Sequence, residues 1–208
     1  EAFAERFLGM MNSSALALMT SIGHRTELFD TLAELPPSTS QQIADAAGLN
    51  ERYVREWLGA MVTGGFVEYD ARAKTYSLPA EHAAFLTRAS SPDNLAPFAQ
   101  YIPLLGAVED QIVDCFYKGG GVPYSQFKRF HEVMAEDSGQ TVVAALEEHL
   151  LPLIPGLLEG LQQGLEVLDV GCGSGLALNK LARLFPNSRF SGYDFSEQAI
   201  ARATDEAK

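Results

Sequence analysis

Glu166-Val-Leu-Asp-Val-Gly-Cys-Gly-Ser-Gly175 is a short apolar run that passes directly into a glycine-rich loop. Further along the chain, Gly192-Tyr-Asp194 ends a second run of strand-like residues. The run, the loop and the amphipathic segment after it predict a strand, a tight turn and a helix, which is how an open α/β sheet presents a nucleotide site. The sequence therefore predicts a site for a nucleoside-like cofactor.

The spacing of the glycines separates two classes of cofactor. A dinucleotide fingerprint requires G-x-G-x-x-G, because the pyrophosphate must approach the backbone and rest on the helix N-terminus. Here the glycines are Gly171, Gly173 and Gly175, and Leu176 stands where the third dinucleotide glycine would be. The carboxylate of Asp169, just before the loop, would repel a pyrophosphate but attract an ammonium or a sulfonium group. The pattern favours a cofactor without phosphate groups.

These residues resemble a known family. Asp169-Val-Gly-Cys-Gly-Ser-Gly175 matches the D-x-G-x-G-x-G first motif of class I S-adenosylmethionine-dependent methyltransferases, and Gly192-Tyr-Asp-Phe-Ser196 is similar to their second motif. The resemblance implies S-adenosyl-L-methionine as the cofactor, with the first loop, including Cys172, around its methionine part. It also implies that Asp194 holds both ribose hydroxyls and that Phe195 lies against the adenine.

The same residues have plainer interpretations. The glycines could form a strand-to-helix turn in some other α/β protein. Asp194 could be only a strand-end turn residue or the cap of the next helix. Cys172 is interpreted as structural rather than nucleophilic, because no histidine lies near it in the sequence and a small side chain suffices in the loop.

Length and composition bound the class of protein. A chain of 208 residues with 47% hydrophobic content can bury a sizeable core, and no apolar run reaches the length of a membrane span. With only Cys115 and Cys172, a reducing cytoplasm fits best. The net charge of -12 argues against nucleic acid as the main partner. We therefore expect a cytoplasmic protein with no membrane or nucleic-acid partner, and no metal site is predicted.

The first region, residues 1–88, is predicted to be a helical winged-helix domain. Apolar residues recur at helical spacing from Phe3 and Phe7 onward, and the pattern continues until Pro36-Pro37 stops the helix. A capped helix over 39–48 follows, then a second helix over 51–62 with an apolar face and two strands at 66–69 and 75–78. The apolar face of the second helix carries Val54, Trp57, Leu58 and Met61. This order is typical of a winged helix-turn-helix, for which transcription is the obvious function.

The second helix of this motif argues against DNA reading. Its polar face carries Glu51, Arg52, Arg55 and Glu56, whereas a DNA-reading helix shows an excess of positive charge. The module resembles instead the amino-terminal domain of small-molecule O-methyltransferases. That resemblance implies a homodimer through the amino-terminal helices and a contribution to closing the substrate pocket. A winged-helix regulator or scaffold with a nucleoside-sensing Rossmann portion stays as the alternative.

Residues 89–163 are predicted to be a helical linker, with a loop at residues 119–123. Within it, residues 127–138 are similar to the Phe-x-x-x-Met linker helix of the same O-methyltransferases, which implies that Phe130 and Met134 lie over the cofactor. Both could instead be ordinary core residues. His131 is a candidate general base because imidazole titrates near neutral pH, although the family supplies its base later in the catalytic domain. Its alternative is a surface or capping role.

The sequence thus predicts a mainly α amino-terminal winged-helix domain followed, at residues 164–208, by the opening β-α-β of a Rossmann-like α/β methyltransferase domain. The expected function is transfer of a methyl group from S-adenosylmethionine to a small-molecule acceptor by in-line displacement. A class I sheet has seven strands, of which the sequence supplies two, and the chain begins at Glu1 without Met. We therefore expect a piece of a longer protein, inactive by itself.

Overall fold

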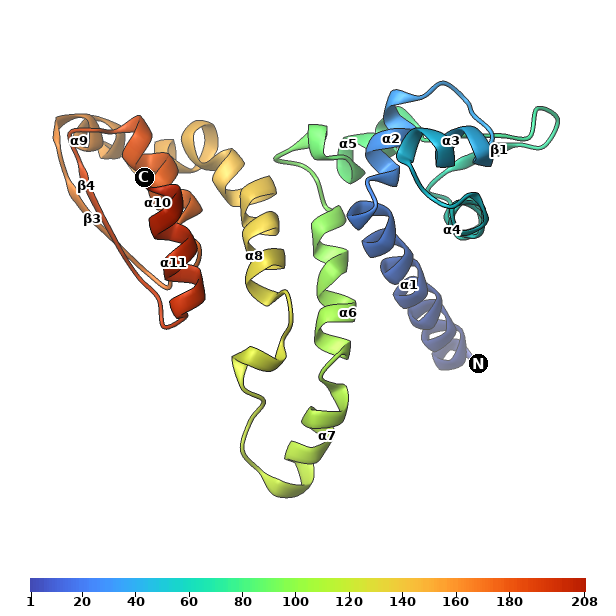
Figure 1. Cartoon of the computed structure of the whole chain (residues 1–208), viewed down its shortest axis with the longest axis horizontal. Helices are drawn as coiled ribbons and strands as arrows, with labels where there is room; N and C mark the ends of the chain where they lie inside the picture. Colours follow the sequence, from blue (N-terminus) through green and yellow to red (C-terminus); the bar gives the residue numbers. More distant parts are fainter. The chain divides into compact units, whose positions relative to one another are not determined.

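The computed structural model describes all residues from Glu1 to Lys208 and divides them into two compact units, Glu1–Lys128 and Arg129–Lys208 (Figure 1). Each unit contains one two-stranded sheet, and the remainder is largely helical. The fold class predicted from the sequence is confirmed: a helical winged-helix portion precedes the strand, helix and strand of a Rossmann-like domain.

The first unit is a helical assembly with a small antiparallel wing. Capping confirms the predicted helix-turn-helix: Thr39 and Gln42 form a reciprocal capping box, and Gly48 ends the same helix in the left-handed region. The wing pairs Tyr69 with Tyr76 across its two strands. The elements of this unit are α1 (Ala2–Arg25), α2 (Leu28–Glu34), α3 (Ser40–Ala47), α4 (Glu51–Thr63), β1 (Glu68–Asp70), β2 (Thr75–Ser77), α5 (Ala80–Leu86), η1 (Arg88–Ser90), η2 (Ala96–Gln100), α6 (Tyr101–Gly106), α7 (Glu109–Lys118) and η3 (Tyr124–Gln126).

The core of the first unit forms where α4 meets the helices before it. The apolar face predicted for α4 is confirmed, because Val54, Trp57, Leu58 and Met61 are all buried. The indole of Trp57 packs edge-on against Phe29 and donates its Nε1–H to the carbonyl oxygen of Met19 at 2.8 Å. A buried tryptophan needs such a partner, so this bond fixes α4 against the carboxyl-terminal half of α1.

The predicted continuous helix before Pro36-Pro37 is wrong in one respect. The structure breaks it after Arg25 and starts α2 at Leu28, with Glu27 in the left-handed region at φ 59°. After the break, Leu28, Phe29 and Leu32 of α2 are all buried in the core. Tertiary burial therefore overrides the local helical pattern at this point.

Gly23 in α1 is predicted to be sensitive to any side chain. A Cβ built there would overlap the indole of Trp57 and lie 2.8 Å from Cε2 of Phe29. We expect Gly23→Ala to lower the free energy of unfolding by about 1–3 kcal/mol, as overpacked cores do. The matched control is Gly9→Ala in the same helix, where nothing lies within 4 Å. Gly9→Ala should raise the free energy of unfolding by about 0.5–1 kcal/mol. Urea denaturation of both variants checks this, and equal midpoints for the two would contradict it.

The second unit contains a parallel strand pair and the helices packed on it. Both predicted strands are confirmed, with Asp169 opposite Gly192 and Val170 opposite Tyr193. Helix α10 (Leu176–Leu184) packs against β4 (Arg189–Tyr193) and against α11 (Glu197–Glu206) (Figure 1). The elements are α8 (Phe130–Ser138), the π-helical turns η4 (Gly139–Val143) and η5 (Leu146–Leu150), η6 (Leu151–Leu153), α9 (Leu157–Gln163), β3 (Glu166–Val170), α10 (Leu176–Leu184), β4 (Arg189–Tyr193) and α11 (Glu197–Glu206).

The two faces of this strand pair differ in burial. Val167 and Phe190 pack against a small core of Leu151, Leu161, Leu181 and Phe185. On the opposite face Leu168, Val170 and Tyr193 are exposed, Val170 at 78%. One face of the strand pair is therefore covered by the core and the other is open.

No helix of the structure has both the length and the apolar character needed to cross a membrane.

Candidate functional site

The glycine loop between β3 and α10 adopts a conformation that requires its glycines. Gly171, Gly173 and Gly175 all have positive φ, at 88°, 54° and 70°, in the region that other residues rarely enter. The carbonyl oxygen of Tyr193 at the end of β4 accepts from the amides of Gly171 at 2.6 Å and Cys172 at 3.1 Å. The loop is thus fastened across the carboxyl ends of both strands, where open α/β sheets bind ligands.

Most of the loop's backbone donors are engaged within the protein. Besides the two amides on Tyr193, the amide of Gly173 donates to Asp194 at 2.9 Å and that of Gly175 donates to the carbonyl oxygen of Cys172 at 2.9 Å. A phosphate cradle depends on amides that point at the ligand. The arrangement therefore offers a shaped loop but few donors for a pyrophosphate.

The carboxylate of Asp194 is fixed by both of its oxygens. Oδ2 accepts from the amide of Gly173 and Oδ1 accepts from the amide of Ser196 at 2.8 Å. Asp194 is therefore a turn residue, as one interpretation of the sequence has it, and it also ties the second motif to the first. Each oxygen keeps a further lone pair, so the side chain can accept additional hydrogen bonds in a fixed direction.

Cys172 lies in the loop as a half-buried thiol. Burial raises the pKa of the Cys172 thiol, and the nearby carboxylates of Asp169 and Asp194 raise that pKa further because they oppose a second negative charge. Reactive cysteines have the opposite environment, one that stabilises the thiolate. The geometry supports the structural role interpreted from the sequence.

The candidate residues of helix α8 differ in how deeply their side chains are buried. Val133 is the fully buried residue of this helix, whereas Phe130 is half-buried and Met134 is 43% exposed. Phe130 and Met134 therefore lie outside the core of this unit, unlike the alternative in which they are core residues. His131 packs its ring edge-on against Phe130, and its Nε2 lies 3.1 Å from Oγ of Ser196.

The second motif ends in an exposed aromatic ring. Phe195 is 75% exposed between Asp194 and the start of α11, and Asp169 is half-buried at the end of β3. Ser196 caps α11 by accepting from the amide of Ala199 at 3.2 Å. Asp169, the three loop glycines, Cys172 and Asp194 are thus brought together at one edge of the strand pair, with Phe195 beside them.

Gly192 is a position on which the packing of the loop depends, although the sequence gives it no role beyond the second motif. A Cβ at Gly192 would lie 2.6 Å from Sγ of Cys172 and 2.6 Å from Cδ1 of Leu178. The missing side chain lets the loop and α10 sit directly on β4. A glycine inside a strand is the available signal, since it often marks a close approach of another segment.

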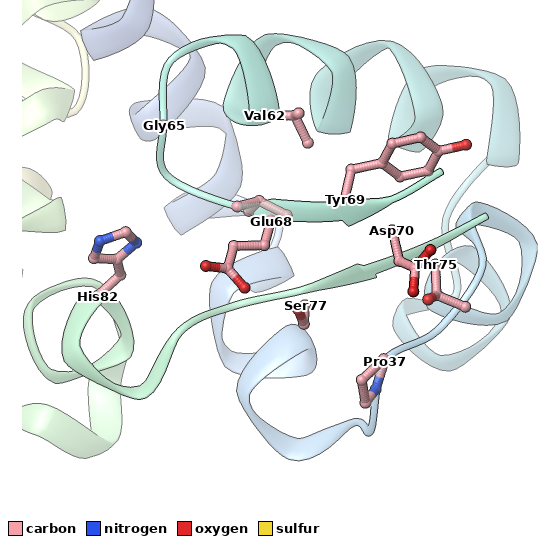
Figure 2. Close-up of a pocket in the computed structure, with 10 residues that line it drawn as sticks. Pro37, Val62, Gly65, Glu68, Tyr69, Asp70, Thr75, Ser77 and His82 are labelled. Atoms are coloured by element: carbon pink, nitrogen blue, oxygen red, sulfur yellow. The ribbon is translucent and has the colours of Figure 1, made fainter. Parts of the chain in front are cut away.

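The first unit has a cavity of about 700 Å³ beside the wing, lined by Pro37, Val62 and wing residues (Figure 2). One of its polar groups, the carboxylate of Asp70, serves the wing's own turn. Asp70 accepts from the amides of Arg72 and Ala73, and the hydrogen bonds from Ala73 and then Arg72 lower the pKa of Asp70. With Glu68 also on the cavity wall, this surface is unfavourable for a phosphate backbone.

Two family models match the chain. A model described as an Rv2258c-like winged HTH domain matches residues 14–88, and a model described as a methyltransferase domain matches residues 161–208. No curated protein matches the chain in sequence.

Solved structures give similarity over nearly the whole chain. A Nostoc punctiforme protein assigned as an O-methyltransferase is 20% identical with a TM-score of 0.67, covering 98% of this chain and 60% of that one. Human N-acetylserotonin methyltransferase, in complex with SAM, is 17% identical with a TM-score of 0.63, covering 97% and 62%. The mitomycin 7-O-methyltransferase MmcR is 16% identical with a TM-score of 0.66, covering 98% and 61%.

The chain spans about three fifths of the length of these structures, at 60% to 62%. At such identities the similarity shows the fold. The two family models agree with that fold: residues 14–88 match a winged HTH model and residues 161–208 match a methyltransferase-domain model, in that order along the chain.

Proposed function

We propose that the whole protein transfers a methyl group from S-adenosylmethionine to a small-molecule acceptor. The observation that carries the proposal is the carboxylate of Asp194, fixed by the amides of Gly173 and Ser196 beside a loop whose own amides are mostly engaged. Such a site suits a ligand that has two ribose hydroxyls and no phosphate. The solved relatives bound to SAM or SAH support the same cofactor.

The residues of the site have separate tasks in this proposal. Asp194 accepts from the ribose hydroxyls, and Phe195 lies against the adenine. The loop from Gly171 to Gly175 surrounds the methionine part, and Asp169 attracts its ammonium group or the sulfonium. Phe130 and Met134 of α8 form an apolar wall over the cofactor.

The chemistry explains why an apolar wall is useful. When bound, S-adenosylmethionine would supply an electrophilic sulfonium methyl group, which the acceptor atom would attack in line while S-adenosylhomocysteine leaves. The rate of such a displacement depends on alignment of the reacting atoms and on exclusion of water. Apolar side chains such as Phe130 and Met134 serve both needs without a charged group.

Methyl transfer itself tests this function. The whole protein, incubated with methyl-labelled S-adenosylmethionine and the small-molecule fraction of its own cells, should move label into a small-molecule product and release S-adenosylhomocysteine. Cofactor binding without any such product over all extract fractions would favour the regulator alternative, in which the same unit only senses a nucleoside ligand.

We further propose that two copies of the chain associate through α1. Residues 1–13 are exposed throughout, and the exposed side chains include Phe3 at 71% and Leu8 at 63%. A helical segment of this length is only marginally stable in water without packing. A groove of about 510 Å³ beside the other half of α1, lined by apolar residues such as Phe85, Leu95 and Phe98, offers a surface for such packing.

Substitution on α1 tests the dimer. Leu8→Glu is expected to raise the dimer dissociation constant at least about tenfold, because it places a charge at the apolar centre of the contact. The matched control is Tyr53→Glu on α4, an exposed large side chain outside α1, at 75% exposure against 63% for Leu8. Sedimentation velocity should give a dimer for wild type and Tyr53→Glu and a monomer for Leu8→Glu. A wild-type monomer at micromolar concentration would contradict the dimer, and salt-dependent binding of duplex DNA would favour the regulator alternative.

A further inference from the structure

One side chain connects helix α8 to the second motif. Nε2 of His131 and Oγ of Ser196 share a hydrogen bond at 3.1 Å. The amide of Ser196 donates to Oδ1 of Asp194, and Oδ2 of Asp194 accepts from the amide of Gly173. A continuous series of hydrogen bonds therefore runs from α8 through the β4–α11 turn to the glycine loop.

The same imidazole also orients an aromatic ring. The rings of His131 and Phe130 are T-shaped, with centroids 5.7 Å apart and planes at 82°. This edge-to-face geometry is the one that aromatic pairs favour. His131 thus contacts both the turn that holds Asp194 and the side chain that α8 would present to the cofactor.

We propose that His131 is a positioning residue for the cofactor site. It fastens α8 to the Asp194 turn and so sets the direction of the Asp194 carboxylate and of the Phe130 ring together. The proposal rests on the proposed function, in which Asp194 and Phe130 contact S-adenosylmethionine. A site whose binding groups are held in place before the ligand arrives binds more tightly, because less motion is lost on binding. In this role His131 acts through Ser196 and Phe130 and takes no proton from the acceptor.

Two substitutions separate the hydrogen bond from the ring contact. His131→Phe keeps an aromatic ring against Phe130 and removes Nε2. His131→Gln restores a polar group near the position of Nε2 and removes the ring. The matched control is His149→Phe, an exposed histidine of the same unit. Each protein is compared with wild type by amide hydrogen exchange without ligand and by calorimetric titration with S-adenosylhomocysteine, in the whole protein.

The expected result is local. In His131→Phe, exchange should accelerate in segments 171–175 and 194–199, which contain the amides bonded to Asp194, and stay unchanged in α9. Affinity for S-adenosylhomocysteine should fall about 3- to 10-fold in His131→Phe, the loss of one hydrogen bond. His131→Gln, which restores the polar group but not the ring, should lose less affinity than His131→Phe. His149→Phe should match wild type in both measurements.

Four results would overturn the positioning role. Unchanged exchange in both segments, or faster exchange throughout the unit, means that His131 does not act on the site specifically. If wild type binds S-adenosylhomocysteine and His131→Phe binds it equally well, only the positioning role is refuted. If wild type binds no S-adenosylhomocysteine, the proposed function is contradicted and the cofactor role of His131 with it, whatever the exchange pattern.

Discussion

Replacement of Asp194 by alanine is expected to weaken binding of S-adenosylhomocysteine to the whole protein by about 10- to 100-fold. A carboxylate that accepts from ribose hydroxyls makes charge-assisted hydrogen bonds of about 1.5–3 kcal/mol each, and each 1.4 kcal/mol is about tenfold in affinity. The structure adds a second cause. Asp194 also accepts from the amides of Gly173 and Ser196, so its removal loosens the loop that surrounds the rest of the cofactor.

Two further variants make this test specific. Glu197→Ala removes an exposed carboxylate three residues along the chain and should leave the affinity unchanged. Asp194→Asn keeps the shape of the side chain but replaces one accepting oxygen by an NH₂ group, which cannot accept a hydrogen bond. The affinity of Asp194→Asn for S-adenosylhomocysteine should therefore be closer to that of Asp194→Ala than to that of wild type. Calorimetric titration gives the dissociation constants. An unchanged constant in Asp194→Ala would show that Asp194 is only a turn residue.

Replacement of Gly192 by valine is expected to disrupt the second unit and its site together. The Cβ alone would lie 2.6 Å from Sγ of Cys172 and from Cδ1 of Leu178, so the loop and α10 must both move away from β4. Overpacking of this kind costs about 1–3 kcal/mol in folding free energy. Since the displaced loop is the one that Asp194 holds, affinity for S-adenosylhomocysteine should fall by at least about tenfold, the equivalent of 1.4 kcal/mol.

Ser191→Val is the matched control for Gly192→Val. Ser191 precedes Gly192 on β4 but lies on the open face of the strand pair, where valine suits a strand and meets no loop. The Ser191→Val protein should keep the folding stability of wild type and its affinity for S-adenosylhomocysteine. Chemical denaturation and titration of the two variants measure the difference, and a Gly192→Val protein as stable and as tight-binding as Ser191→Val would refute the close-packing account.

Local signals in the sequence predict much of the fold correctly. The capping residues Thr39 and Gly48, the buried face of α4 and both strands of the second unit follow from patterns within a few residues of one another. Helix ends depend on local hydrogen bonds and strand runs on side-chain alternation, so short windows are sufficient. The glycine spacing is similarly local, and positive φ at all three loop glycines agrees with it.

What the sequence does not predict depends on contacts between distant residues. The break at Glu27 is set by burial of the residues after it, and no glycine or proline marks it. The hydrogen bond between His131 and Ser196 joins positions 65 residues apart, so neither neighbourhood reveals it. The double role of Asp194 is similar: its position after a strand predicts a turn or a ligand contact, whereas the structure adds the bond to Gly173.

Titration of the whole protein with S-adenosylhomocysteine and, separately, with NAD tests the central claim most directly. The engaged amides of the glycine loop and the fixed Asp194 carboxylate predict saturable binding of S-adenosylhomocysteine and no detectable heat with NAD. Saturable binding of NAD, together with no binding of S-adenosylhomocysteine, would contradict the account.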